Sequence, residues 1–180
     1  MTQTHKTLLS LVMTSVLFSA SAGAASDNTI NFQGEVADET CSISVNGNAA
    51  SPVVLMPTVS KSALSASGNV AGQTAFTVGL TGCTANSASS TKISTVFVGN
   101  NVTANGNLAN TGTAQNVEVQ LVDSKDAVIN LTGGYTGDGD LTLAADETES
   151  SATYNAQYYA NGVATAGTVA ASLQYAVTYQ

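Results

Sequence analysis

The sequence predicts an all-β sandwich in a single domain, and three observations support this prediction. Short apolar segments that alternate with polar residues recur along the chain, and clusters of Gly, Asn, Ser and Asp separate them. The chain contains no convincing helical pattern. About 155 residues remain after the N-terminal export signal, which suits one domain with its own core. Seven or more such strands are typical of a sandwich.

The first 24 residues are predicted to form a signal peptide. A basic start and an apolar run over residues 8–20 precede Ala22-Gly23-Ala24, the small residues that signal peptidase requires. Cleavage is expected after Ala24 or Ala25. The apolar run is too short to span a membrane, so we expect an exported protein without membrane insertion.

The expected strands follow from period-two alternation, as where Val117, Val119 and Leu121 oppose Glu118 and Gln120. In chain order they are Asp27–Val36, Thr40–Val45, Gln73–Cys83, Lys92–Gly99, Asn116–Val122, Ala127–Leu131, Leu141–Leu143, Thr153–Tyr159 and Val169–Tyr179. Pro52–Pro57 is expected to be extended at a sheet edge, because proline cannot donate to a ladder. Ser60–Gly68 is predicted to contain one helical turn.

The last strand combines length with strict alternation. Its odd positions are apolar or aromatic and its even positions are small or polar, with no Lys or Pro to protect an exposed edge. A second alternating strand, Asp27–Val36, would stand at the new N-terminus after cleavage. Exposed strand edges recruit strands from other chains. Both strands could equally pair within their own domain.

Composition argues against several functions. The chain has twelve acidic residues against four lysines, no arginine, and a single histidine that lies in the signal. We therefore expect no nucleic-acid partner, because the surface is acidic. We also expect no cofactor and no enzymatic activity, because the chain after the signal has no histidine to act as a general base or metal ligand. Cys41 and Cys83 are the only cysteines and are expected to form one disulfide in an oxidising compartment.

Two other candidate sites have simpler explanations. Acidic residues between Asp138 and Glu149 match part of a calcium-loop spacing, but Leu143 occupies the position that requires glycine. A solvated acidic loop is favoured there. The tyrosines at 154, 158 and 159 could form a sugar site, although packing is the more usual role of strand tyrosines.

The mature sequence resembles the shaft subunits of chaperone-usher fimbriae of Gram-negative bacteria, the type 1-like fimbrial proteins. The similarity rests on Ile30-Asn-Phe32-Gln-Gly34-Glu-Val36 before Cys41, on the strand that ends at Cys83, and on Tyr154–Tyr159. It also rests on Gly167, fourteenth from the end, and on Tyr179 as the penultimate residue.

The resemblance implies an incomplete immunoglobulin-like sandwich, the six-strand-type pilin fold, which a donor strand from a neighbouring chain completes. Residues 25–35 would be the donor extension and residues 36–180 the pilin domain. Asn28, Ile30 and Phe32 would be the donor side chains. The acceptor groove and chaperone-binding strand would comprise Gly167, Val169, Ala171, Leu173, Tyr175, Val177, Tyr179 and Gln180.

The function implied by the resemblance is that of a structural fimbrial subunit that polymerises by donor-strand exchange into a surface pilus supporting adhesion. Its expected partners are identical or related pilin subunits, a periplasmic chaperone and an outer-membrane usher. Export through the periplasm would lead to a fimbrium on the cell surface. The alternative is a minor pilin or a secreted lectin-like sandwich that binds host carbohydrate.

Overall fold

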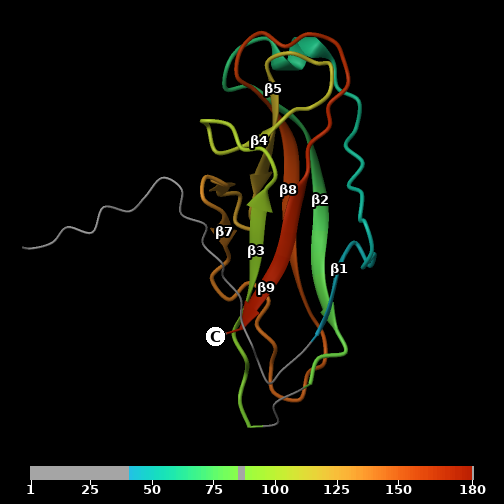
Figure 1. The fold of residues 1–180 in the computed structure, drawn as a ribbon, viewed down its shortest axis with the longest axis vertical. Helices are drawn as coiled ribbons and strands as arrows, with labels where there is room; N and C mark the ends of the chain where they lie inside the picture. The colour runs from blue at the N-terminus through green and yellow to red at the C-terminus, as the bar shows by residue number, and fades with distance from the viewer. Residues whose placement is uncertain (1–40, 85–87, 180) are drawn as a thin grey trace, which may run out of the picture. The chain divides into compact units, whose positions relative to one another are not determined.

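Two antiparallel sheets make up the domain (Figure 1). The computed structural model describes residues 41–84 and 88–179. One sheet has the order β1-β2-β8-β5-β4, with β6 also paired to β5, and the other has the order β7-β3-β9. The elements are β1 (Ser42–Val45), η1 (Lys61–Leu64), β2 (Val70–Thr81), β3 (Ile93–Gly99), β4 (Leu108–Ala109), β5 (Val117–Val122), β6 (Val128–Ile129), β7 (Tyr135–Thr136), β8 (Ser150–Ala160) and β9 (Leu173–Tyr179). The predicted all-β class is confirmed.

The long pair β2 and β8 forms the centre of the larger sheet. Phe76 lies opposite Tyr154 and Val78 opposite Ala152, so their inward side chains meet across the ladder. The register shifts between Ala71 and Thr74. Gly72 adopts a φ of +68° at this bulge, where a Cβ would lie 2.9 Å from the Tyr158 ring. Only glycine combines this backbone conformation with such close packing.

The main core lies between the two sheets. Its largest fully buried side chains include Phe97 and Tyr154, whose rings meet edge to face at 5.0 Å. The Tyr154 hydroxyl donates to Asp140, whose other carboxylate oxygen accepts from the Thr95 amide at 3.1 Å. Burial and the hydrogen bond to Asp140 raise the pKa of Tyr154. The buried phenol is thus kept neutral and partnered, as core packing requires.

A buried carboxylate, Glu118 on β5, connects two loops at one end of the larger sheet. It is 3% exposed and accepts hydrogen bonds from Asn107 at 2.8 Å, Asn161 at 2.8 Å and Asn105 at 3.1 Å. Burial by itself would raise the pKa of Glu118, but these hydrogen bonds outweigh it and hold the pKa below its ordinary value. The network ties the loop before β4 to the turn after β8.

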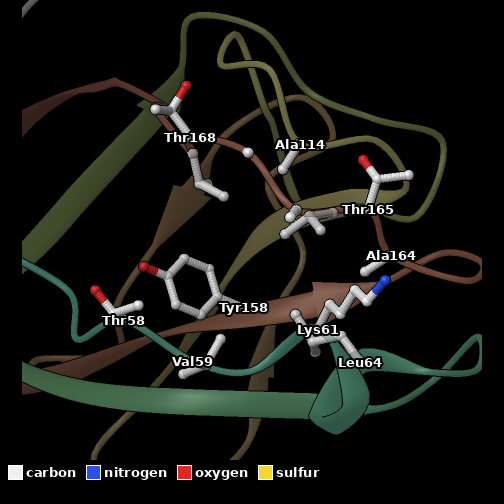
Figure 2. Close-up of a pocket in the computed structure, with 13 residues that line it drawn as sticks. Thr58, Val59, Lys61, Leu64, Ala114, Tyr158, Ala164, Thr165 and Thr168 are labelled. Carbon is white, nitrogen blue, oxygen red and sulfur yellow. The ribbon is translucent and has the colours of Figure 1, made fainter.

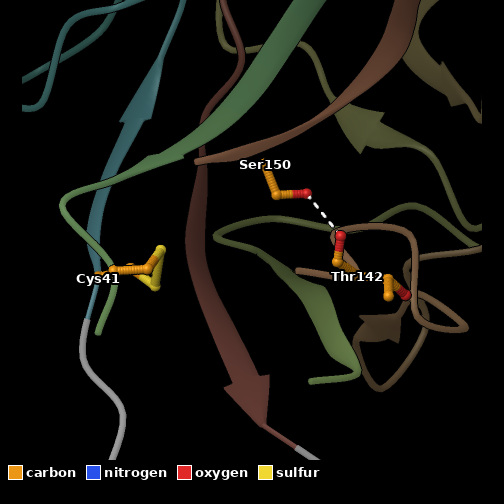
Figure 3. The surroundings of a disulfide bond; sticks show 4 residues. Cys41, Thr142 and Ser150 are labelled. Atoms are coloured by element: carbon orange, nitrogen blue, oxygen red, sulfur yellow. Dashed lines mark hydrogen bonds between the residues drawn. A yellow bond between two sulfur atoms is a disulfide. The ribbon is translucent and has the colours of Figure 1, made fainter. Parts of the chain in front are cut away.

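The disulfide between Cys41 and Cys83 confirms the predicted pairing. It joins the residue before β1 to the chain that leaves β2, beside the hydrogen bond from Ser150 to the Thr142 carbonyl (Figure 3). The sequence separation of 42 residues corresponds to a stabilisation of about 4 kcal/mol by the loop-entropy argument.

Some predicted elements differ from the structure. Residues 52–57 are extended but belong to no strand, and Leu141–Leu143 is wrong as a strand because only a bridge from Leu143 to Thr91 forms. The last strand begins at Leu173 rather than Val169. The single helical turn is confirmed as η1, where the Ser60 hydroxyl accepts from the Ser62 amide. No helix in the described ranges is long and apolar enough to cross a membrane.

Candidate functional site: an open strand edge

The strand β9 lies at the edge of the smaller sheet. It pairs with β3 in an antiparallel register that runs from Ile93 opposite Tyr179 to Gly99 opposite Leu173. Within residues 41–84 and 88–179, no strand pairs with the other side of β9. Figure 1 shows β9 in red beside β3. The last strand of the sandwich therefore presents an edge on which another strand can be added.

Side chains alternate strictly along residues 169–177. The odd positions are half-buried and their side chains pack against the main core, whereas the even positions are exposed. The half-buried side chains are those of Val169, Ala171, Leu173, Tyr175 and Val177, and Tyr179 continues the row. This row forms an apolar lining that the two sheets leave partly uncovered.

The backbone hydrogen-bonding groups of the same segment point alternately to its two sides. Even residues accept hydrogen bonds from the β3 side: Ser172 from Asn100 at 3.2 Å, Ala170 from Thr111 at 2.8 Å, and Thr168 from Ala114 at 3.0 Å. Both polar groups of one strand residue point to the same side, and successive residues alternate. The N–H and C=O groups of the odd residues 169–177 therefore point to the open side, where the described residues provide no strand partner.

The register of hydrogen bonding explains why the strand begins late. Residues 168–172 continue the line of β9, but their partners come from the loop 110–114 and from Asn100 rather than from a strand. Asn110 reinforces this contact by accepting from the Ala170 amide at 2.9 Å. Val169 and Ala171 accordingly belong to the same edge although they lie outside β9. The "open edge" below means residues 169–177.

A second extended segment, residues 52–57, lines the same core. Val54 and Met56 are half-buried and pack against it, while Val53 and Leu55 point outward with 73% and 85% of their surface exposed. No strand in the described part of the chain pairs with this segment. The core is therefore bordered by apolar side chains from two segments, residues 52–57 and the last strand.

A pocket of about 450 Å³ adjoins the beginning of the open edge (Figure 2). The segment 164–169, η1 and strands β5 and β8 enclose it, and Val59, Leu64, Val117 and Tyr158 give it an apolar lining. Lys61 is the only charged residue among the residues that line it. Val169 belongs to both the pocket and the open edge, so the two form one continuous surface.

Gly167 allows the segment 164–169 to lie directly against the loop 110–114. A Cβ on Gly167 would lie 2.4 Å from the backbone nitrogen of Ala114, a distance that side-chain carbons do not adopt. Because the obstructing atoms belong to the backbone, they cannot rotate away. The residue type at position 167 is thus dictated by the approach of the segment 164–169 to the loop 110–114.

The structure brings most of the predicted acceptor residues together. Gly167, Val169, Ala171, Leu173, Tyr175, Val177 and Tyr179 follow one another along this surface. The predicted donor residues Asn28, Ile30 and Phe32, together with Gln180, lie outside the described residues. Sequence reasoning missed Val54 and Met56 as lining residues. The alternation within Pro52–Pro57 indicated an extended segment, but it carried no signal that this segment borders the same core as the last strand.

The acidic loop around Asp138 has structural roles. Lys92 Nζ lies 2.6 Å from Asp138 Oδ1, and Asp140 binds Tyr154 and the Thr95 amide. The described ranges contain no cluster of three or more His, Cys, Asp or Glu side chains suited to a metal ion. Tyr154 is 2% exposed, so its ring belongs to the core rather than to a sugar-binding surface.

Comparison with solved structures identifies the fold. The chain is similar to the P pilus rod subunit PapA, with a TM-score of 0.59 and 22% identity over 78% of this chain and 99% of that one. It is also similar to a subunit in the structure of a chaperone-usher pilus, with a TM-score of 0.57 and 21% identity over 86% of this chain and 96% of that one. The fold is therefore that of chaperone-usher pilins, consistent with the incomplete immunoglobulin-like sandwich.

Sequence comparison identifies the family. The family model described as "Fimbrial protein" matches residues 30–180. The F17 fimbrial protein of Escherichia coli is 36% identical over 90% of this chain and 92% of its own length. The major fimbrial subunit SMF-1 of Stenotrophomonas maltophilia is 35% identical over 88% of this chain and 95% of its own. Both relatives are fimbrial subunits rather than enzymes. The chain therefore belongs to the fimbrial protein family and is a structural subunit of a cell-surface fimbrium.

Proposed function

We propose that this subunit polymerises by donor-strand exchange, in which residues 25–35 of one copy add a strand to the open edge of the next. The observation that supports the proposal is the open edge itself. Its odd residues turn half-buried apolar side chains toward the core and their backbone groups toward the side on which the described residues place no strand. An added strand with apolar side chains at alternate positions satisfies both sets of groups at once.

The donor extension has the complementary pattern. Ile30 and Phe32 are separated by one residue, which puts their side chains on one face of a strand, and Asn28 continues that face. Burial of about 400 Å² of apolar surface per joint at ~25 cal/mol per Å² contributes on the order of 10 kcal/mol as an upper bound. Joints of this strength suit a fibre that persists outside the cell.

Before assembly the open edge needs a temporary partner. An exposed apolar edge of this length aggregates in free solution, so a periplasmic chaperone is expected to lend a strand and hold the Gln180 carboxylate. An outer-membrane usher would then exchange that strand for the extension of the incoming subunit. Cleavage of residues 1–24 is the step that frees the extension.

Deletion of residues 27–34 tests the proposal. The shortened subunit is expected to be exported and to bind the chaperone but to form no fibres. A sharper variant replaces Ile30 and Phe32 with serine, and its matched control replaces Thr29 and Asn31, on the opposite face of the strand, with alanine. The serine variant is expected to lose the heat-sensitive ladders of the purified fibre on denaturing gels, whereas the control keeps them. Fibres of normal length from the deletion variant would contradict the proposal.

A peptide complementation assay provides an independent measurement. Residues 36–180 refolded with a synthetic peptide of residues 25–35 are called the peptide-filled subunit below. We expect a monomer that unfolds cooperatively, while residues 36–180 without the peptide aggregate or remain only partly folded. A stable monomer in the absence of the peptide would show that the domain is complete by itself.

A further inference from the structure

A loop of the larger sheet replaces β3 as the partner of the chain where the open edge begins. β3 ends at Gly99, and Asn100 still reaches the Ser172 carbonyl at 3.2 Å. Before that point, residues 165–170 lie against the loop 110–116 between β4 and β5. Because β4 and β5 pair with each other on either side of this loop, both of its ends are fixed to the larger sheet. The loop therefore connects the larger sheet to the beginning of the open edge.

Backbone amides of this loop supply the donors of the contact. The Thr111 N–H donates to the Ala170 carbonyl at 2.8 Å, and the Ala114 N–H donates to the Thr168 carbonyl at 3.0 Å. Ala114 and Thr168 both line the pocket beside the edge (Figure 2). These two bonds use backbone groups only, so they place no demand on the side chains of the loop.

The acceptors, by contrast, are side chains. The Asn110 Oδ1 accepts from the Ala170 amide at 2.9 Å, and the Thr113 hydroxyl accepts from the Thr168 amide at 2.9 Å. In a regular antiparallel ladder, backbone carbonyls of the neighbouring strand would accept these bonds. Here the side chains take the place of those carbonyls. This half of the pairing therefore depends on the residue types at positions 110 and 113.

The loop itself holds Asn110 in position. The Asn110 Oδ1 also accepts from the Gly112 amide at 2.8 Å, and its Nδ2 donates to the Ala114 carbonyl at 2.8 Å. Gly112 lies so near the edge that a Cβ on it would overlap the Thr168 carbonyl oxygen. The half-buried Asn110 amide thus uses both its oxygen and its nitrogen, and it is already oriented toward the Ala170 amide.

We propose that Asn110 and Thr113 are positioning residues for strand addition, because they hold residues 168–170 in line with β9. Val169 and Ala171 then keep their backbone groups turned toward the added strand. This inference rests on the proposed function. Without the two side-chain acceptors, the amides of the exposed residues 168 and 170 bind water instead, and this part of the chain leaves the line of β9. The acceptor edge then shortens to residues 173–177, which pair with β3.

Hydrogen exchange in assembled fibres tests the proposal. The exported full chain is assembled into fibres as wild type, Asn110→Ala and Thr113→Val, and mass spectrometry with fragmentation resolves exchange at the odd amides of the open edge. The wild-type fibre is expected to protect all of them, because the added strand accepts their hydrogen bonds. Each variant is expected to exchange about tenfold faster at Val169 and Ala171, with no change at the odd amides within 173–177.

Matched controls separate positioning from general stability. Thr113→Ser keeps the hydroxyl acceptor and is expected to keep the wild-type protection. Asn101→Ala removes an exposed asparagine side chain that makes no hydrogen bond within residues 41–84 and 88–179, and it is also expected to exchange as wild type does. Faster exchange along the whole strand in Asn110→Ala would indicate a structural role alone and would overturn the proposal. If Asn110→Ala is not exported, the comparison of Thr113→Val with Thr113→Ser gives the same test.

The remaining outcomes distinguish this proposal from the proposed function. A wild-type exchange rate at Val169 and Ala171 in either variant overturns the positioning role of the residue that was changed. Wild-type fibres that protect residues 173–177 but leave Val169 and Ala171 unprotected overturn it for both residues. Failure of the proposed function gives a different result, in which the odd amides within 173–177 also exchange freely in wild-type fibres because no strand is added.

Discussion

Glu118 shows how a single carboxylate can hold loops together without a positive partner. Three asparagine side-chain amides donate hydrogen bonds to its two carboxylate oxygens. These hydrogen bonds take the place of a positively charged partner. Replacing Glu118 with glutamine puts an amide donor where the asparagines also donate. At least one buried donor would then lack an acceptor, which costs about 1–3 kcal/mol.

We therefore expect Glu118→Gln to lower the free energy of unfolding of the peptide-filled subunit by about 1–3 kcal/mol at pH 7. The pKa of Glu118 is lowered in the folded state, so its contribution is complete above the ordinary pKa of 4.5 and is lost as the pH falls through the lowered value. The difference between wild type and variant should shrink as the pH falls below 4.5, as measured by urea unfolding at several pH values. A difference that stays constant with pH would exclude ionisation as its cause.

Gly167 provides a steric test at the same scale. Alanine at this position would place its Cβ 2.4 Å from the Ala114 nitrogen and displace residues 164–169, at a cost of about 1–3 kcal/mol. Thermal unfolding of the peptide-filled subunit should report this loss, together with weaker binding of the peptide. Gly79→Ala is the matched control, because a Cβ there meets the nearest atom, Ser44 Oγ, at 3.5 Å. Equal effects of the two substitutions would show that Gly167 has no special steric role.

The extended segment 52–57 illustrates why elements without a ladder are hard to place from sequence. Its alternation indicates extended backbone, but nothing in the sequence says that Val54 and Met56 border the same core as β9. That proximity depends on how the two sheets pack. The sequence likewise predicted strand over Leu141–Leu143, where the apolar residues are buried but only one bridge forms. Alternation identifies a buried face and does not guarantee a partner.

The border role of this segment leads to a prediction. Met56→Ser removes a half-buried apolar side chain from the core that the donor would cover in the proposed joint. The affinity for the donor peptide should then fall by about 5- to 30-fold, equivalent to about 1–2 kcal/mol. Leu55→Ser changes a side chain that is 85% exposed and should alter affinity by less than about 0.5 kcal/mol. Peptide dissociation followed by fluorescence distinguishes the two. Similar losses for both variants would mean that the donor contacts the outer face of the segment.

The terminal strand was the element best predicted from sequence. Its odd residues face the core and its even residues face solvent, as the alternation indicates. The error of four residues at its start has a physical origin, since residues 169–172 keep the extended conformation while a loop replaces β3 as their partner. Hydrogen-bond partners that are distant in sequence are not visible in a local pattern. The pocket beside Gly167 could not be predicted for the same reason.

For the whole molecule, the disulfide contributes stability by restricting the unfolded chain. Replacing Cys41 and Cys83 with serine should lower the free energy of unfolding of the peptide-filled subunit by about 4 kcal/mol, because the unfolded chain gains the freedom of a 42-residue loop. Urea unfolding with and without the bridge measures the loss. An unchanged midpoint would indicate that the unfolded chain keeps its two cysteine positions close together by other means.

The position of the same bridge has a mechanical meaning in a fibre assembled as proposed. Tension on the fibre reaches each subunit through its own extension, which joins the described fold at Cys41. The short β1, with four residues, would carry this load alone if the chain were reduced. The covalent link to Cys83 instead passes the load to the end of β2, which pairs with β8 over most of its twelve residues. In such a fibre the bridge would therefore prevent tension from separating β1 from β2 and unfolding the domain from its first strand.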